Sequence, residues 1–415
     1  MRILWVTNQA TPELGKELGL KIGFGGGWMT WLSRQVAAKH SLLMVFPIPE
    51  CYKGQLRGNS NKVTGIGIPI KKGTETPCEQ TTEIIAEIIS EYKPDVIHIW
   101  GTEYLHSYQA IKACEKLSKL DHTIVSIQGL VSIYAKHFWA YAKSCSEYES
   151  FLQSITTRNS LHRQYHSYIA RGEYEKRTLR EAKNVIGRTD WDKACAKLYN
   201  PGIHYFHCNE TLREAFYNDV WDYEKCEKHS LFVSQGQYPI KGLHLALEAV
   251  GIIKNRYSDV KLYVTGSDCI KRRKNMTSYE LYIHNKIIEY GLQKNVVFTG
   301  YLDERKMKER FINSNVFISA SSIENSPNSL GEAMLLGVPV VTSDVGGVKN
   351  MINHGVEGYV YPADEPYMLA HYVMEIFASE SKTIEMSQEA RKHAMNTHDP
   401  DKNYMTLMNI YEAII

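Results

Sequence analysis

The chain has 415 residues, with 48 Lys and Arg against 46 Asp and Glu, and a formal net charge of +2. This length suits two α/β domains, and the even charge balance predicts no nucleic acid or other polyanionic partner. The eight cysteines form no Cys-x-x-Cys pair, which argues against a zinc or redox motif and favours a reducing compartment.

The first half of the chain alternates strand and helix patterns. Such alternation predicts a mostly parallel sheet with helices on both faces. The apolar runs predict strands at 3–6, 42–46, 94–100, 123–127 and 185–186, with a glycine-rich loop at 23–27 and a helix at 28–39.

The second half repeats this pattern. Strands are predicted at 230–234, 260–264, 295–299, 316–318, 338–341 and 359–361, and a helix at 243–255. We therefore predict an N-terminal Rossmann-like domain over 1–210 and a C-terminal one over 211–395, facing each other across a cleft. By analogy with the fold, a last helix within 396–415 crosses back to the first domain. Ligands of such sheets bind at the carboxyl ends of strands.

One stretch, 132–183, has helical periodicity without a clear strand, and we interpret it as a helical insertion. It is rich in Lys, Arg and aromatic residues. One interpretation is a surface for anionic lipid or a lipid-linked acceptor. The other is a pair of solvated helices with aromatic inner faces, which we favour because solvated charged faces are so common.

The segment from Ser322 to Ala333 is the most informative one, because it lies between two predicted strands and holds two glutamates eight residues apart. Pro327 suits a first helical position, and Ser326 or Asn328 suits a cap. The amides of Asn328, Ser329 and Leu330 would then lack helical acceptors and form an anion site, with Glu324 on the loop and Glu332 in the first turn. A diphosphate between two hydroxyl-binding carboxylates has the shape of a nucleotide-sugar. The alternative is that the glutamates only complement the helix dipole.

Further candidates follow other predicted strands. Lys241, in Pro-Ile-Lys-Gly, would direct a positive charge at a diphosphate, or lie in solvent. Tyr301 offers a platform for a nucleobase, or lies on a rim, and Gly266 permits close approach of a ligand. Arg188 would hold phosphates, or pair with Asp190 or Asp192. Gly26 and Gly27 belong to a glycine loop that suits a phosphate but equally suits a flexible loop.

Together these motifs resemble retaining glycosyltransferases of family 4, which have the GT-B fold. The resemblance covers almost the whole chain. It rests on the paired glutamates running on to 337–341, on the lysine segment 239–243, on the strand end 297–301 and on the glycines at 25–27.

The resemblance implies a role for each matching residue. Glu324 would hold the donor sugar, Glu332 the ribose, and Lys241 the diphosphate, so we take Glu324 and Lys241 as catalytic and expect no metal. The expected donor-binding residues are Gly26, Gly27, Gln128, Arg188, Lys241, Gly266, Tyr301, Glu324, Asn328, Ser329, Leu330 and Glu332.

The chain departs from the family pattern at two places. Where many relatives carry a phosphate-binding arginine, it has Gly236, Gln237 and Tyr238, and we hypothesise that Arg188 supplies the charge instead. Where relatives carry a histidine near the sugar, it has Gln128, which orients a ligand but does not titrate.

The sequence thus predicts transfer of a sugar from a nucleotide-sugar, UDP-linked by weak preference, to a hydroxyl of a glycan or lipid-linked acceptor, with retention, in surface polysaccharide biosynthesis. The alternatives are a GT-B sugar-nucleotide epimerase, a glycan phosphorylase, or a catalytically silent nucleotide- or glycan-binding protein. The N-terminal apolar run is too short for a signal peptide, and no run reaches the ~20 residues of a membrane span. We therefore expect a cytoplasmic protein, with peripheral contact at the inner face of the membrane if 132–183 binds lipid.

Overall fold

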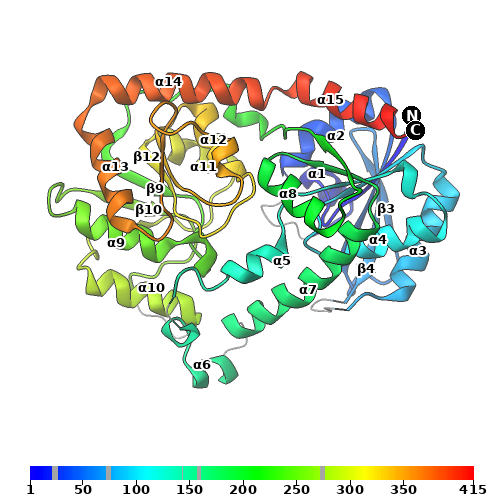
Figure 1. Ribbon diagram of the computed structural model, residues 1–415, viewed down its shortest axis with the longest axis horizontal. Coiled ribbons are helices and arrows are strands. Elements are labelled where there is room, and N and C mark those ends of the chain that lie inside the picture. The colour runs from blue at the N-terminus through cyan, green and yellow to red at the C-terminus, as the bar shows by residue number, and fades with distance from the viewer. Residues whose placement is uncertain (21–26, 72–75, 143, 157–159, 272–275) are drawn as a thin grey trace. The chain divides into compact units, whose positions relative to one another are not determined.

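The computed structural model describes residues 1–20, 27–71, 76–142, 144–156, 160–271 and 276–415. Two compact units are present (Figure 1). The first unit comprises Met1–Ile133, Ser167–Arg213 and His398–Ile415, and the second comprises Tyr134–His166 and Glu214–Thr397. Part of the predicted insertion thus groups with the second unit, whereas the sequence analysis placed all of it in the first.

The first unit is built on an eight-stranded sheet in the order β3-β4-β2-β1-β5-β6-β7-β8, parallel except for the antiparallel pairing of β3 with β4. Asn61 and Lys62 join those two strands, both with positive φ. The strands are β1 (Arg2–Val6), β2 (Ser41–Pro49), β3 (Leu56–Ser60), β4 (Val63–Ile70), β5 (Val96–Trp100), β6 (Thr123–Ser126), β7 (Asn184–Gly187) and β8 (His204–His207). Strands β3, β4 and β8 were not predicted from the sequence, and β7 was expected to be the last strand of this half.

Helices cover both faces of this sheet. Successive side chains of each strand point to opposite faces, so an apolar strand needs a core on each side. Leu4 and Val6 of β1 pack into one core with α3 and α4, and Ile3 and Trp5 pack into the other core with α2 and α15. The helices of this unit are α1 (Pro12–Glu17), α2 (Gly27–Lys39), α3 (Glu79–Tyr92), α4 (Leu105–Lys116), α8 (Asp190–Tyr199) and α15 (Pro400–Ala413). Helices α5 (Val131–Tyr134) and α7 (Leu161–Glu181) contribute to both units.

Buried hydrogen bonds fix α15 to the first sheet. The Tyr411 hydroxyl accepts from Trp5 Nε1 at 3.0 Å and lies 2.6 Å from His98 Nδ1, while His98 Nε2 lies 2.6 Å from Ser126 Oγ. Complete burial holds the pKa of His98 well below its ordinary value, so the imidazole is neutral. We therefore assign His98 a structural role.

The second unit contains a six-stranded, wholly parallel sheet in the order β11-β10-β9-β12-β13-β14. Its strands are β9 (Glu227–Val233), β10 (Lys261–Val264), β11 (Val296–Phe298), β12 (Ser314–Ser319), β13 (Val340–Ser343) and β14 (Tyr359–Tyr361). Its helices are α6 (Phe151–Thr156), α9 (Leu243–Ile253), α10 (Ser278–Glu289), α11 (Glu304–Ile312), α12 (Asn328–Leu336), α13 (Pro366–Ala378) and α14 (Glu380–Thr397). Helices α9 and α13 pack together, as do α12 and α14.

A buried carboxylate ties the insertion to the rest of the second unit. Glu149 accepts hydrogen bonds from Ser160 Oγ at 2.8 Å, from the Leu161 amide at 3.0 Å, from the His162 amide at 3.1 Å and from Ser278 Oγ at 2.8 Å. The carboxylate therefore satisfies the start of α7 and joins it to α10. Within the described residues, no helix is long and apolar enough to cross a membrane.

Candidate functional site

Two of the predicted residues meet at the carboxyl ends of β9 and β12, which are neighbouring strands of the second sheet. Lys241 lies in the 3₁₀ turn Pro239–Lys241 after β9, and Glu324 lies in the loop after β12. Lys241 Nζ is 2.5 Å from Glu324 Oε1, and Ser321 Oγ donates to the same oxygen at 2.7 Å. The Glu324 side chain is 9% exposed and that of Lys241 is 18% exposed, so this ion pair is largely shielded from water.

Backbone contacts without room for side chains hold this pair in place. Gly242 has φ of +65°, and a Cβ there would lie 1.8 Å from the Ala320 carbonyl oxygen. Gly346 has φ of +52°, and a Cβ there would lie 1.9 Å from the Glu324 carbonyl oxygen. Gly347 donates its amide to that same oxygen at 3.1 Å. The Glu324 loop is therefore fixed from two sides by glycine-containing turns.

The helix after Glu324 begins one residue later than predicted. Pro327 takes the N-cap position, α12 begins at Asn328, and the cap has no side-chain hydrogen bond. The prediction of Pro327 inside the helix with Ser326 or Asn328 as its cap is wrong. A proline at the cap position has no side-chain acceptor to offer the first-turn amides.

Two of the three predicted amides remain suited to an anion. Leu330 is fully buried and donates its amide to Pro327 O at 3.0 Å, so the prediction that this amide lacks an acceptor is wrong. Asn328 and Ser329 are half-buried first-turn residues, whose amides have no acceptor within a helix. Glu332 is buried in the second turn rather than the first, with 4% exposure.

The predicted base-binding edge lies at the ends of β10 and β11. Gly266, with φ of +123°, donates its amide to Gly300 O at 3.0 Å, and Tyr301 beside it is 64% exposed. The Gln237 side chain donates to Thr265 O at 2.8 Å, and a Cβ on Gly266 would lie 2.1 Å from Gln237 Nε2. One of the three residues at the place of the family's arginine, Gln237, therefore covers Gly266, a role that the sequence did not suggest.

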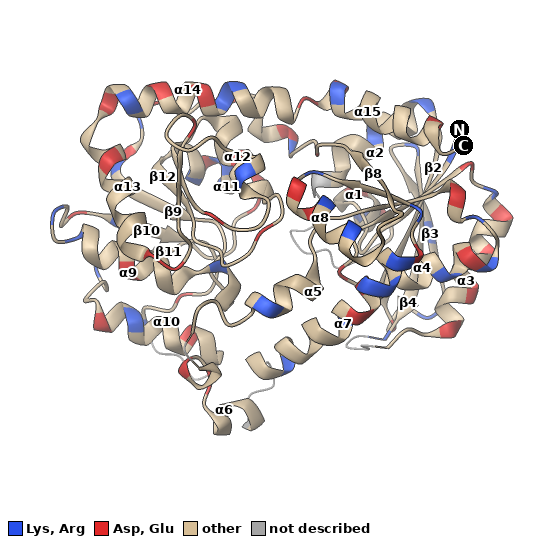
Figure 2. Ribbon diagram, viewed as in Figure 1, with Lys and Arg blue, Asp and Glu red and all other residues tan. Residues whose placement is uncertain are grey.

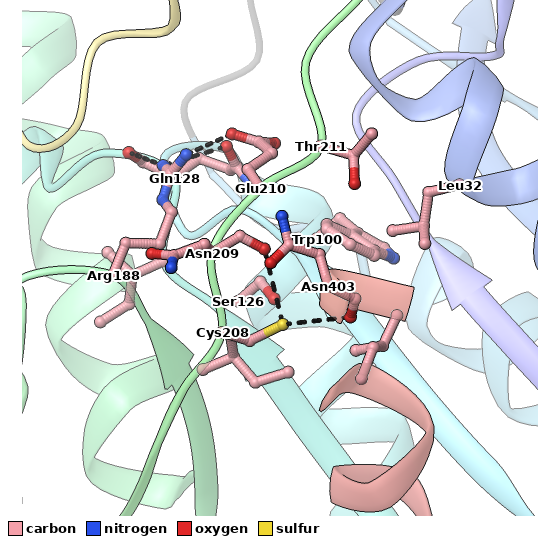
Figure 3. Close-up of a pocket in the computed structure, with 13 residues that line it drawn as sticks. Leu32, Trp100, Ser126, Gln128, Arg188, Cys208, Asn209, Glu210, Thr211 and Asn403 are labelled. Atoms are coloured by element: carbon pink, nitrogen blue, oxygen red, sulfur yellow. Dashed lines mark hydrogen bonds and ion pairs between the residues drawn. The ribbon is translucent and has the colours of Figure 1, made fainter. Parts of the chain in front are cut away.

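In the first unit, Arg188 is held by a carboxylate that the sequence analysis missed. Its guanidinium forms a buried ion pair with Glu210 and donates to Gln128 O at 3.1 Å, as Figure 3 shows. Asp192 accepts from the Arg188 backbone amide at 2.9 Å and from the Tyr205 hydroxyl. Of the two predicted partners, Asp192 is thus bound to the main chain and not to the guanidinium. Glu210 follows β8, a strand that was not predicted from the sequence.

The cavity beside this ion pair is small. It encloses about 30 Å³ and is lined by residues that include Trp100, Ser126, Cys208 and Thr211 (Figure 3). This volume holds one or two waters rather than a nucleotide-sugar. Burial raises the pKa of the Cys208 thiol to about 12, so this cysteine is no nucleophile at neutral pH.

Gly26 lies outside the described residues, and Gly27 is the first residue of α2. Among the residues that the structure describes, no group of three or more His, Cys, Asp and Glu side chains has a geometry that would hold a metal ion. Metal independence stays a prediction.

Comparison with known protein families finds a match within the second unit. Residues 218–393 match the family model of glycosyl transferases group 1. This unit contains a glycosyl transferases group 1 domain. Two curated relatives agree with this result: the uncharacterised glycosyltransferase MJ1607 of Methanocaldococcus jannaschii, and the amylovoran biosynthesis glycosyltransferase AmsK of Erwinia amylovora. The first is 27% identical over 187 residues, 45% of each chain, and the second 24% over 180 residues, 42% of each. The matching part of the chain thus spans less than half the length of either relative.

Similarity to solved structures extends beyond the group 1 domain. Sucrose-phosphate synthase from Thermosynechococcus elongatus gives a TM-score of 0.71 at 15% identity, covering 100% of this chain and 99% of that one. Anabaena HepE in complex with UDP-glucose gives a TM-score of 0.68 at 14% identity, covering 100% of both chains. The predicted GT-B fold of two Rossmann-like α/β domains is confirmed, with the group 1 domain as the second of them.

Proposed function

We propose that the protein transfers a sugar from a nucleotide-sugar to a hydroxyl of a glycan or lipid-linked acceptor, with retention of anomeric configuration and without a metal. The ion pair of Lys241 with Glu324, next to the half-buried start of α12, carries this proposal. It brings a cation, a carboxylate and two first-turn amides to the carboxyl edge of one parallel sheet. Such an edge is where α/β sheets bind ligands, and those groups match a diphosphate joined to a sugar.

Each group has a defined task in this reaction. Glu324 accepts hydrogen bonds from the donor-sugar hydroxyls, and the amides of Asn328 and Ser329 bind the diphosphate. Lys241 moves from the carboxylate toward the phosphate as negative charge develops on the leaving oxygen. The bond from the anomeric carbon to the phosphate oxygen breaks, the acceptor oxygen bonds to that carbon on the same face, and the acceptor proton passes to the phosphate. Glu332 takes the ribose, in keeping with its place on α12 one turn further on.

Several predicted donor contacts belong to the same proposal. Tyr301 is exposed enough to cover a nucleobase, with Gly266 and Gly300 beside it. In the first unit, Gln128 orients the sugar, and Arg188 positions Gln128 through its two contacts with that residue. The engagement of Arg188 by Glu210 favours this positioning role over direct phosphate binding.

The acceptor proposal has separate support. AmsK is named for the biosynthesis of amylovoran, and surface polysaccharide biosynthesis is the pathway that we propose here. The short helix α6 exposes Phe151 to 77%, Leu152 to 73% and Ile155 to 58%, and it carries no charged residue (Figure 2). Exposed apolar clusters of this kind suit the interface of a bilayer, where a lipid-linked acceptor lies. We propose peripheral membrane contact through α6 at the cytoplasmic face.

Thermal-shift measurements with UDP, GDP, ADP and their sugars test the proposal. A true donor raises the melting temperature through linkage, and we expect UDP and a UDP-sugar to do so. Product analysis then separates the alternatives. Turnover driven by inorganic phosphate indicates a phosphorylase, and release of free UDP without a glycosylated product indicates an epimerase. Binding without transfer across a broad acceptor panel indicates a silent binding protein.

A further inference from the structure

A second cavity lies wholly within the second unit and shares no lining residue with the Lys241–Glu324 site. It encloses about 300 Å³. Its walls come from α9, from α10, from the loop before α13 and from residues 140–142, 147 and 148 of the insertion. A volume of this size is at the lower end of those that bind small molecules and admits a sugar ring. Nothing in the proposed transfer reaction uses this cavity.

The floor of this cavity is a fixed hydrogen-bond network. His244 Nδ1 lies 2.9 Å from the Tyr279 hydroxyl, and His244 Nε2 lies 3.0 Å from the Tyr148 hydroxyl and 3.2 Å from Ala140 O. The Tyr148 hydroxyl also donates to Ala140 O, at 3.1 Å. Burial lowers the pKa of His244 to about 4, so the imidazole is neutral and accepts from Tyr279 while donating toward Ala140. This network locks the insertion onto α9 and α10.

The wall above that floor is strained. Ala140 has φ of +42° and Tyr141 has φ of +67°, a left-handed conformation in two consecutive residues with side chains. Such strain persists only where the surroundings enforce it, and it concentrates at functional sites. Here it presents the Tyr141 ring, which is 46% exposed, at the cavity. Tyr141 is therefore a pre-positioned platform.

The rim of the cavity offers hydrogen-bond acceptors. Glu147, Glu248 and Asp364 line it with exposed side chains. Glu147 accepts from the Tyr282 hydroxyl at 3.0 Å. Within the described part of the chain, the carboxylates of Glu248 and Asp364 receive no hydrogen bond. Carboxylates bind hydroxyl donors strongly, so the rim suits a ligand rich in hydroxyl groups.

The single lysine of the cavity argues against a cationic ligand. Lys286 Nζ lies 5.6 Å from the centre of the Tyr282 ring and 5.5 Å from that of the Tyr290 ring. The protein's own ammonium group thus already interacts with two of the aromatic rings that a cation cage would need. That ammonium is also paired with Glu289, at 3.0 Å from its Oε2, and an ammonium has three donors, so one is left for a ring or glycosidic oxygen. An aromatic platform, carboxylate acceptors and one ammonium donor together match a neutral sugar.

We propose that this cavity is a second carbohydrate site, which binds one hexose unit with its apolar face on Tyr141 and its hydroxyls on Glu248 and Asp364. The binding itself does not depend on the transfer reaction. If the proposed function holds, the site anchors an internal sugar of a glycan while another part of that glycan reacts.

Saturation-transfer NMR on the full-length protein tests this assignment. The probes are the methyl α-glycosides of glucose, galactose, mannose and N-acetylglucosamine, with choline as the cationic alternative. We use the E324Q variant beside the wild type, so that the Lys241–Glu324 site does not contribute. We expect saturable millimolar binding of at least one glycoside to both proteins, and none of choline.

Variants locate the bound sugar. Tyr141→Ala and Glu248→Gln each weaken glycoside binding by about tenfold, and Glu385→Gln, an exposed carboxylate on α14, leaves it unchanged. Glu248 is exposed, so its variant remains informative if Tyr141→Ala fails to fold. The assignment is overturned if no glycoside binds saturably, if choline binds instead, or if the E324Q variant alone abolishes binding. If the wild-type protein binds a glycoside but transfers no sugar, the proposed function is contradicted and the carbohydrate site is still supported.

Discussion

Lys241 Nζ lies 2.5 Å from Glu324 Oε1, an ion pair between residues that follow two neighbouring parallel strands and are 83 positions apart in the chain. Ser321 donates to the same carboxylate oxygen. The two charges compensate each other in a site that is largely shielded from water, where either one alone would be costly. The pair is also adaptable, because an ammonium group on a flexible stem can exchange one anion for another.

Replacing Glu324 should separate catalysis from nucleotide binding. Glu324→Gln keeps the size of the side chain but removes the charge that binds Lys241 and the sugar hydroxyls. We expect turnover to fall by about 10²–10³-fold, with the UDP-induced thermal shift largely kept. Glu332→Gln should instead reduce that thermal shift. Glu385→Gln is the control, and near-wild-type kinetics in both site variants would refute the assignment.

The glycine beside Glu324 should be intolerant of a side chain. Gly346→Ala places a Cβ 1.9 Å from the Glu324 carbonyl oxygen in a left-handed conformation, which by itself costs about 1–2 kcal/mol. Gly355→Ala is a matched control, because φ is +79° there and no atom lies within 4 Å of the added Cβ. Thermal unfolding should show a larger loss for Gly346→Ala, together with weaker UDP binding. Equal losses would mean that the close approach to Glu324 is unimportant.

The buried pair of Arg188 and Glu210 should show strong coupling. Removing one partner leaves an uncompensated buried charge, so Arg188→Met or Glu210→Leu alone should lower the free energy of unfolding by about 3–5 kcal/mol. The double variant should be destabilised by less than either single one. Denaturant unfolding of the four proteins gives the coupling energy. Additive losses in the free energy of unfolding would contradict the coupling of the pair. An Arg188 variant with unchanged donor affinity and turnover would show that this residue is not part of the site.

Stability should depend on pH through Glu149. Burial alone would raise the pKa of this carboxyl, but hydrogen bonds from His162, Ser160 and Ser278 outweigh it and lower the pKa to about 2. The folded pKa lies below the unfolded one, so the contribution to stability is complete above about pH 4.5 and is lost as the pH falls through about 2. Glu149→Gln should therefore lower the melting temperature at neutral pH, by a margin that narrows below about pH 4.5. A margin independent of pH would contradict this assignment.

Membrane contact should depend on α6. Leu152→Ser and Phe151→Ser should each weaken binding to phosphatidylglycerol vesicles in co-sedimentation by about 30-fold, because burying such a side chain is worth about 2 kcal/mol. Leu198→Ser is the matched control, since Leu198 on α8 has the same 73% exposure as Leu152. Equal binding by all three variants would exclude α6 as the contact.

Most of the fold was predictable from periodicity. The strands of the second sheet were all identified, because largely buried parallel strands are rich in apolar residues. Strand β3 was missed because Leu56–Ser60 is largely polar, and β8 because His204–His207 lies at a partly exposed sheet edge. Strand β4 was missed because two glycines and a proline interrupt the apolar pattern of Val63–Ile70. The grouping of 134–166 with the second unit depends on contacts such as that of Glu149 with Ser278, which join residues 129 positions apart and leave no local signal.

The sequence by itself determined that Lys241, Glu324 and the start of α12 lie at one edge of a sheet, because parallel strands bring their carboxyl ends together. Only the tertiary structure decided which groups bind one another there. In the structure Glu210 pairs with Arg188, the Gln237 side chain lies against Gly266, and the Leu330 amide donates to Pro327 O. Strand periodicity predicts the position of a residue in the sheet. The partner of its side chain depends on distances across the fold that no local pattern encodes.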